Sequence, residues 1–122
     1  MEMKILIADD SKFSRTVMQG ILKQHGYTNF IEASNGIEAI NYYLQAQPDI
    51  AFLDITMPQV SGLTALEQIL KHDPNAKVVM CSAMSTSYNI AEAMEVGAKG
   101  FIAKPNFNNV IDVMDQLLLE RG

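Results

Sequence analysis

Short apolar runs alternate along this chain with segments whose apolar residues recur at helical spacing. The runs occupy residues 4–8, 30–33, 50–54, 77–81 and 99–103. Parallel strands need a crossover connection, usually a helix, so regular alternation is typical of a parallel sheet that helices cover on both faces. Because such crossovers are right-handed, a doubly wound sandwich is the simplest topology. We therefore predict a five-stranded α/β fold.

The segments between the runs carry helix signals. Asp10 or Ser11 can cap the first helix, Asn35 and Glu38 have capping-box spacing before the second, and Thr86 lies in a cluster of candidate caps before the fourth. The apolar residues expected to face the core are Phe13, Val17, Ile21 and Leu22, then Ile37, Ile40, Tyr43 and Leu44, then Leu63, Leu66, Ile69 and Leu70, then Ile90, Met94 and Val96, and finally Phe107, Val110, Ile111, Met114, Leu117 and Leu118.

Composition narrows the classes of protein. The 122 residues suit one domain, 48% of them are hydrophobic, and no apolar run approaches membrane-spanning length, so we expect no membrane insertion. A net charge of -5 opposes attraction to phosphate backbones, so direct nucleic-acid binding is not expected. The single cysteine, Cys81, excludes a disulfide framework, and without a signal-peptide pattern we expect a cytoplasmic protein.

Polar residues follow four of the apolar runs. Asp9 and Asp10 end the first, Asp54 ends the central one, and Ser82 and Lys104 follow the last two. Ligands of open parallel sheets bind at the carboxyl ends of the strands, where these side chains converge. Two carboxylates about 4 Å apart repel by roughly 4 kcal/mol at an effective dielectric of 20, so three need a cation, and hard oxygen ligands suit Mg²⁺. Asp54 could then be a nucleophile for a phosphoryl group.

Taken together, these motifs resemble the receiver domains of two-component response regulators, over residues 1–122. The residues that carry the resemblance are Asp9-Asp10, Asp54 with Met57-Pro58 and Gly62-Leu63, Ser82-Ala83, Gly97-Ala98, and Phe101 followed by Lys104-Pro105. The flavodoxin-like strand order 2-1-3-4-5 follows from this resemblance, because alternation of elements alone does not fix it. The resemblance implies a single-domain regulator of the chemotaxis type.

The resemblance also implies a role for each site residue. A histidine kinase would donate the phosphoryl group to Asp54. Asp10 and Asp54 would be direct Mg²⁺ ligands, Asp9 would act through water, and the backbone carbonyl of Thr56 would be the remaining protein ligand. Such a domain is a phosphoacceptor that catalyses its own transfer and dephosphorylation, and it is not an enzyme with a separate substrate.

Switching is implied in the same way. Lys104 would pair with Asp54 before phosphorylation and with a phosphoryl oxygen afterwards, while Ser82 bonds another oxygen and Phe101 rotates inward. The face formed by the fourth helix, fifth strand and fifth helix would then bind a target protein. Pro105 is expected to follow a cis bond.

Other positions near the site differ from the common family pattern or invite a further hypothesis. Thr56 and Met84 are expected to flank the phosphoryl group, and we hypothesise that the apolar Met84 slows its loss. Asn106 stands where the family usually has Phe, which displaces the aromatic to Phe107. Residues expected on the docking face are Tyr88, Ile90, Met94 and Lys99.

Four alternative functions differ in the residues that they require. A phosphohydrolase of the haloacid-dehalogenase type needs an acid two residues after its nucleophile, where this chain has Thr56. A flavodoxin-like electron carrier needs a hydroxyl-rich phosphate loop after its first strand, where this chain has two aspartates. A receiver that serves purely as a docking module needs none of the phosphorylation residues, yet all are present. An intermediate receiver in a phosphorelay fits the motifs as well as a chemotaxis-type regulator does.

Overall fold

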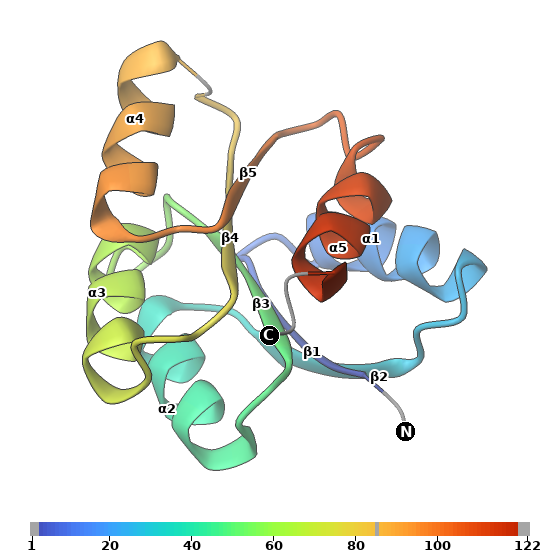
Figure 1. The fold of residues 1–122 in the computed structure, drawn as a ribbon, viewed down its shortest axis with the longest axis horizontal. Coiled ribbons are helices and arrows are strands. Elements are labelled where there is room, and N and C mark those ends of the chain that lie inside the picture. Colours follow the sequence, from blue (N-terminus) through green and yellow to red (C-terminus); the bar gives the residue numbers. More distant parts are fainter. Residues whose placement is uncertain (1–2, 85, 120–122) are drawn as a thin grey trace.

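A computed structural model describes residues 3–84 and 86–119, and it contains a parallel sheet of five strands with five helices (Figure 1). The strands are β1 (Lys4–Ala8), β2 (Asn29–Ala33), β3 (Ile50–Asp54), β4 (Val78–Ser82) and β5 (Gly100–Ala103). The helices are α1 (Lys12–Gln24), α2 (Gly36–Ala46), α3 (Gly62–His72), α4 (Ser87–Val96) and α5 (Val110–Leu119). The strand order is β2-β1-β3-β4-β5, which confirms the predicted doubly wound, flavodoxin-like fold.

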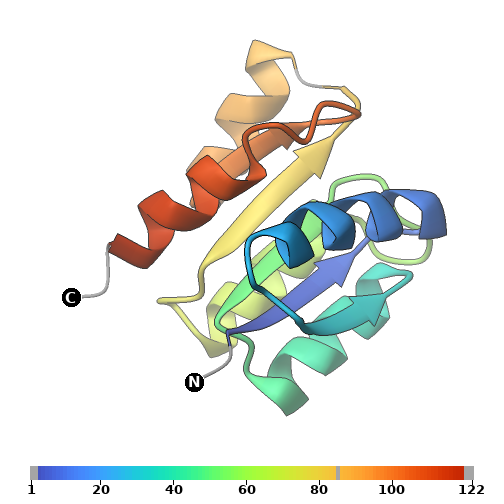
Figure 2. The same ribbon diagram turned by 90° about the vertical axis from the view of Figure 1, so that its right-hand side faces the viewer.

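Helices cover both faces of the sheet, with α1 and α5 on one face and α2, α3 and α4 on the other (Figures 1 and 2). Successive strand residues point to opposite faces, so the core has two parts. In β1, Ile5 and Ile7 pack with the apolar residues of α1 and α5, whereas Leu6 and Ala8 pack with those of α2, α3 and α4. Every residue of β3 and β4 is buried, as expected of central parallel strands.

The N-caps predicted for three helices are found, and the side-chain bonds at α2 differ in detail from the prediction. Ser11, Asn35 and Thr86 are the N-caps of α1, α2 and α4. The capping box at α2 is not closed as expected, because the Glu38 carboxylate accepts from the backbone N–H and hydroxyl of Ser34 and not from the N–H of Asn35. The side chain thus reaches one residue further back along the chain.

Several residues predicted for the core are exposed. Phe13 is 78% exposed, and Ile37, Leu44 and Met94 are each between 39% and 44% exposed. The predicted residues Leu22 of α1 and Tyr43 of α2 are buried, and Met18, Ala39 and Ala93, which were not predicted, are buried as well. The alanines let α2 and α4 approach the sheet closely, so the buried face of these two helices is offset from Ile37, Leu44 and Met94.

The connection after β5 accommodates the Asn106 variation. The Lys104–Pro105 peptide is cis, as expected. The Asn106 side chain accepts from the N–H of Asn108, and Phe107 is only 7% exposed. The aromatic residue therefore reaches the core just before α5 begins at Val110.

In the described part of the chain, no helix combines the length and the apolar character needed to cross a membrane.

Candidate functional site

Strand register places the candidate residues at one edge of the sheet. Asp54 of β3 lies beside Cys81 of β4, and Ser82 of β4 lies beside Ala103 of β5. β1 is paired with β3 up to Ala8, so Asp9 follows at the same edge. Side chains that are separated by up to 95 positions in the sequence thus meet at the carboxyl ends of the strands, as predicted.

Three carboxylates form a cluster at this edge. One oxygen from each of Asp9, Asp10 and Asp54 lies within 4.8 Å of the others, and Asp10 is exposed whereas Asp9 and Asp54 are each 6% exposed. Mg²⁺ binds oxygen ligands at about 2.1 Å, so opposite ligands are about 4.2 Å apart. The carboxylate donors therefore suit Mg²⁺, the 4.8 Å limit on their separation is slightly wider than this span, and exposed Asp10 leaves the cluster open to water.

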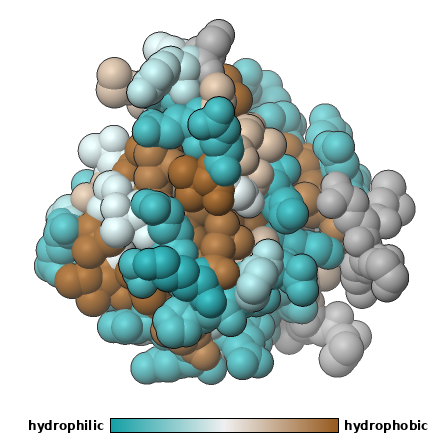
Figure 3. Space-filling model, turned by 60° about the vertical axis from the view of Figure 1, so that its left-hand side comes forward, coloured by the Kyte–Doolittle hydropathy of each residue, from teal (hydrophilic) through white to brown (hydrophobic). Residues whose placement is uncertain are grey.

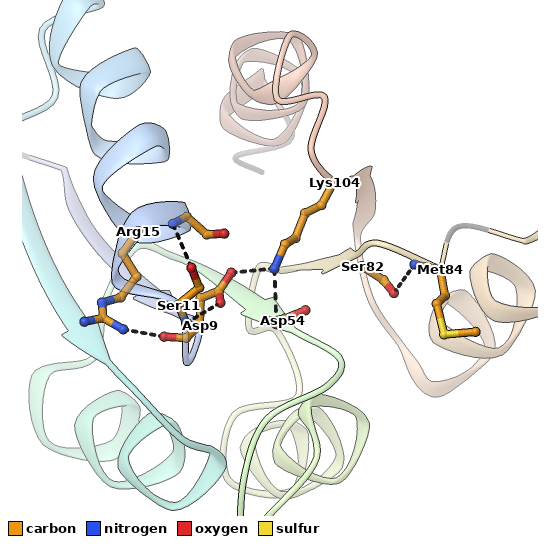
Figure 4. A network of polar contacts seen from close by, with 8 residues as sticks. Asp9, Ser11, Arg15, Asp54, Ser82, Met84 and Lys104 are labelled. Carbon is orange, nitrogen blue, oxygen red and sulfur yellow. Dashed lines mark hydrogen bonds and ion pairs between the residues drawn. The ribbon is translucent and has the colours of Figure 1, made fainter.

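Lys104 compensates the cluster, but its main partner differs from the one predicted. Its Nζ donates to Asp9 Oδ2 at 2.8 Å and to Asp54 Oδ2 at 3.3 Å (Figure 4). The expected pairing with Asp54 exists, yet the shorter bond goes to Asp9. The lysine side chain is 15% exposed, so water screens these ion pairs only weakly.

The electrostatics of the site favour a bound cation. Burial, together with repulsion from Asp9, raises the pKa of Asp54 to about 6, against the attraction of Lys104. Burial lowers the pKa of Lys104, but the hydrogen bond to Asp9 and the charge of Asp54 outweigh it and raise the pKa overall. At neutral pH the lysine is therefore cationic, and Asp54 is mostly ionised but destabilised in that form, which a further positive charge would relieve.

Ser82 points away from the carboxylates. Its hydroxyl oxygen accepts from the backbone N–H of Met84 at 2.9 Å, and the residue is 4% exposed (Figure 4). The carbonyl of Met84 in turn accepts from the side-chain amide of Asn89 at 2.7 Å. The backbone N–H and the carbonyl of Met84 are therefore both bonded, which holds the loop after β4. The Ser82 side chain must rotate to reach a group on Asp54.

The remaining predicted residues surround the cluster at different depths. Thr56 lies exposed in the loop between β3 and α3, and Met84 is 66% exposed after β4. Phe101 in β5 is half-buried and packs against the core beneath α2, α3 and α4. Cys81 is buried beside the site, where burial raises the pKa of its thiol, as expected of an inert cysteine.

Polar residues that sequence reasoning missed also contact the site. The guanidinium of Arg15 donates to the backbone carbonyl of Asp9 at 2.6 Å and to Glu32 Oε1 at 2.8 Å, and Asn89 holds Met84. The sequence offered one signal for the Arg15 contact, which is the charged Glu32 within an otherwise apolar run. A carboxylate in that position needs either water or a cationic partner.

The sequence matches the family described as the response regulator receiver domain over residues 5–115. The chain belongs to this family. The receiver domain is 48% identical to the chemotaxis protein CheY of Listeria monocytogenes, over 84% of this chain and 87% of that protein. It is 39% identical to the chemotaxis protein CheY of Bacillus subtilis, over 94% and 97% of the two chains.

Solved structures agree with this assignment. The receiver domain superposes with a TM-score of 0.90 on a chain from the CheX-CheY-BeF3-Mg complex of Borrelia burgdorferi, at 34% identity over 95% of this chain and 89% of that one. A CheY-like receiver domain protein of Methanospirillum hungatei gives a TM-score of 0.89 at 26% identity, over 98% and 96% of the two chains.

The predicted docking face of the receiver domain carries exposed apolar side chains. Tyr88 is 75% exposed and Met94 44% exposed on α4, Ile90 is partly buried, and Lys99 is exposed just before β5. Figure 3 brings forward the side formed by α2, α3 and α4, where apolar atoms remain at the surface among hydrophilic side chains. Exposure makes these residues available for contact.

Proposed function

We propose that this receiver domain accepts a phosphoryl group on Asp54 from a partner histidine kinase and then controls a target protein in chemotaxis-type signalling. The observation that carries the proposal is the cluster itself, in which three carboxylate oxygens lie within 4.8 Å of one another and the ammonium of Lys104 joins two of the residues. Asp54 ends the central strand, between β1 and β4 at the middle of the site, and we assign it as the acceptor.

Asp9, Asp10 and Asp54, with the backbone carbonyl of Thr56, would hold Mg²⁺. When bound, the ion neutralises charge on the carboxylates and on phosphoryl oxygens. An ionised Asp54 oxygen forms the new O–P bond while the N–P bond of the kinase phosphohistidine breaks and its electron pair returns to the imidazole. Lys104, already 3.3 Å from Asp54 Oδ2, donates to an oxygen of the transferred group.

The switch begins at Ser82. Its hydroxyl exchanges the N–H of Met84 for a phosphoryl oxygen, and Phe101 rotates inward from its half-buried position. These movements change the face formed by α4, β5 and α5, where the target binds. Thr56 and Met84 flank the group and set its lifetime before water removes it.

Two further observations support this reading. The relatives named above are chemotaxis proteins, and one similar chain was solved in complex with a second protein, CheX. A net charge of -5 is consistent with an output through protein contact and not through nucleic acid.

Intact mass measurement tests the chemistry. The natural chain, incubated with a small-molecule phosphodonor and Mg²⁺, should gain a single phosphoryl adduct. The adduct should be absent in Asp54→Asn and in a sample containing a chelator. An adduct that persists in Asp54→Asn would reject Asp54 as the acceptor. Failure to form any adduct after rapid quenching, even with a histidine kinase present, would reject the proposed function.

A further inference from the structure

We propose that Arg15 is a positioning residue for the carboxylate cluster, through a clamp that joins Asp9 to Glu32 on the edge strand β2. The guanidinium donates from Nη1 to the carbonyl of Asp9 at 2.6 Å and from Nε to Glu32 Oε1 at 2.8 Å (Figure 4 shows the first contact). The Arg15 side chain is 14% exposed, although the glutamate is 48% exposed. The inference rests on the proposed function, because it concerns the metal-binding cluster of that same site.

Asp9 is held from several directions. Its N–H donates to the carbonyl of Ala33 at 3.0 Å, its Oδ1 accepts from the N–H of Ser11 at 2.9 Å, and its Oδ2 accepts from Lys104 at 2.8 Å. Arg15, a residue of α1, adds the bond from its side chain to the Asp9 carbonyl. Together these bonds fix both the main chain and the carboxylate of Asp9.

The position of Asp9 affects its neighbours. Asp10 follows directly in the chain, and Asp9 is the second largest cause of the raised pKa of Asp54, after burial. A shift of the turn between β1 and α1 would therefore change the spacing of all three carboxylates. Groups that orient metal ligands without touching the ion commonly change metal affinity by a factor of 10 or more.

Arginine suits this position for geometric reasons. Its planar guanidinium presents separate donors in fixed directions, so it can bond a main-chain carbonyl and a carboxylate at once, whereas lysine offers a single ammonium nitrogen. The hydrogen bond from Arg15 lowers the pKa of Glu32, which is the direction expected when a cationic donor stabilises the carboxylate. The contact therefore depends on the shape of the side chain as well as on its charge.

The test is the Mg²⁺ dissociation constant of the unphosphorylated protein, measured by NMR titration of the backbone amides of residues 9–11. Arg15→Lys and Arg15→Gln should each weaken Mg²⁺ binding on the order of tenfold. Glu32→Gln should weaken it less, because the bond to the Asp9 carbonyl remains. Lys12→Gln, which removes one positive charge from an exposed position at the start of α1, should change it less than twofold.

The metal-free amide signals of Asp9 and Ser11 supply a second readout and should shift in Arg15→Lys. The free energy of unfolding is measured for each variant. If Arg15→Lys binds Mg²⁺ as tightly as the natural chain, the inference is wrong, whether or not stability falls. Equal weakening by Lys12→Gln and Arg15→Gln would also overturn it, since charge alone would then suffice. If the natural chain binds no Mg²⁺, the proposed function fails first and the clamp has no metal site to position.

Discussion

Asp54 is a buried carboxylate that lies beside two others, so its ionised form is destabilised in the metal-free fold. Its pKa is raised to about 6 from an ordinary value of 3.8, first by burial and then by Asp9. A carboxyl group whose pKa is higher in the folded than in the unfolded state binds more protons when folded. The free energy of unfolding contributed by this group therefore falls as the pH rises from about 4 to about 6.

Because this contribution to the free energy of unfolding falls with rising pH, a first prediction can be made for a variant that lacks the carboxyl group. With a chelator present, Asp54→Asn should be more stable than the natural chain at pH 7.5, by at most about 3 kcal/mol, and the difference should vanish near pH 4. Urea denaturation at several pH values measures it. Added Mg²⁺ should stabilise the natural chain more than the variant. If the difference in the free energy of unfolding is independent of pH between 4 and 7, the cause assigned to the Asp54 pKa is wrong.

The second prediction concerns Met84, whose side chain is 66% exposed beside the site. Met84→Glu should speed loss of the phosphoryl group by roughly tenfold, about 1.4 kcal/mol on the barrier, because a carboxylate can orient an attacking water molecule and a thioether cannot. Met84→Leu is the matched control and should keep the natural rate. The decay of the phosphorylated species, followed by intact mass, measures both. An unchanged rate in Met84→Glu would remove Met84 from the residues that set the lifetime.

At the scale of elements, the loop between β3 and α3 is packed tightly against the strand end. A Cβ built on Gly62 would overlap the carbonyl group of Asp54, and the N–H of Gly62 donates to the carbonyl of Ile55 at 2.8 Å. The neighbouring loop residue Val60 likewise leaves no room for a Cβ on Gly36 at the start of α2. These two contacts fix the loop that carries Thr56.

The third prediction compares two glycine substitutions. Gly62→Ala should lower the free energy of unfolding by about 2–3 kcal/mol and reduce phosphorylation of Asp54, because the added methyl group must displace backbone atoms. Gly20→Ala, in an open position of α1, should be neutral or stabilising by up to about 1 kcal/mol. Chemical denaturation and the yield of the phosphoryl adduct measure the pair. A Gly62→Ala protein with natural stability and yield would contradict the packing argument.

Element positions were largely predictable from the sequence, and so were most of the buried helix residues, such as Leu66, Ile69 and Met114, but not all of them. The strand ends, the caps at Ser11, Asn35 and Thr86, and the family residues all follow local patterns that the sequence displays. Phe13 and Ile37 were wrongly assigned to the core, since periodicity gives weight to large residues. In α2 and α4 the fully buried residues Ala39 and Ala93 are small, and only the tertiary structure shows which side of each helix faces the sheet.

At the scale of the whole molecule, the parallel sheet gathers the candidate site residues at one edge, while α4 keeps exposed apolar side chains at Tyr88 and Met94. α4 follows the loop that holds Ser82 and Met84, and Asn89 of α4 bonds that loop directly. A change at the strand ends therefore has a short path to an exposed helix. α2 lies apart from α4 in the same layer, with α3 between them (Figure 1).

The separation of α2 from α4 allows a fourth prediction, in which a residue of α2 is the control for residues of α4. The target is first isolated as a protein that binds only the phosphorylated receiver domain. Tyr88→Ala and Met94→Ala should each weaken its binding to the phosphorylated protein by about tenfold. Ile37→Ala on α2 is the matched control, because Ile37 and Met94 are both 44% exposed, and it should leave affinity unchanged. Titration calorimetry with each variant measures the affinity. Equal affinities for all three variants and the natural chain would exclude α4 as the docking helix.

The sequence alone determined the fold class and which residues reach the functional edge, because strand ends, caps and the order of the family motifs are local properties of the chain. The tertiary structure decided how those residues are paired. Lys104 lies nearer to Asp9 than to Asp54, Ser82 bonds Met84, and Arg15 bridges Asp9 and Glu32. Most of these pairings join segments that are far apart in the chain, and the choice between Asp9 and Asp54 as the nearer partner of Lys104 is a difference of only 0.5 Å. Such distances are set by the packing of the whole molecule, which no local pattern of residues records.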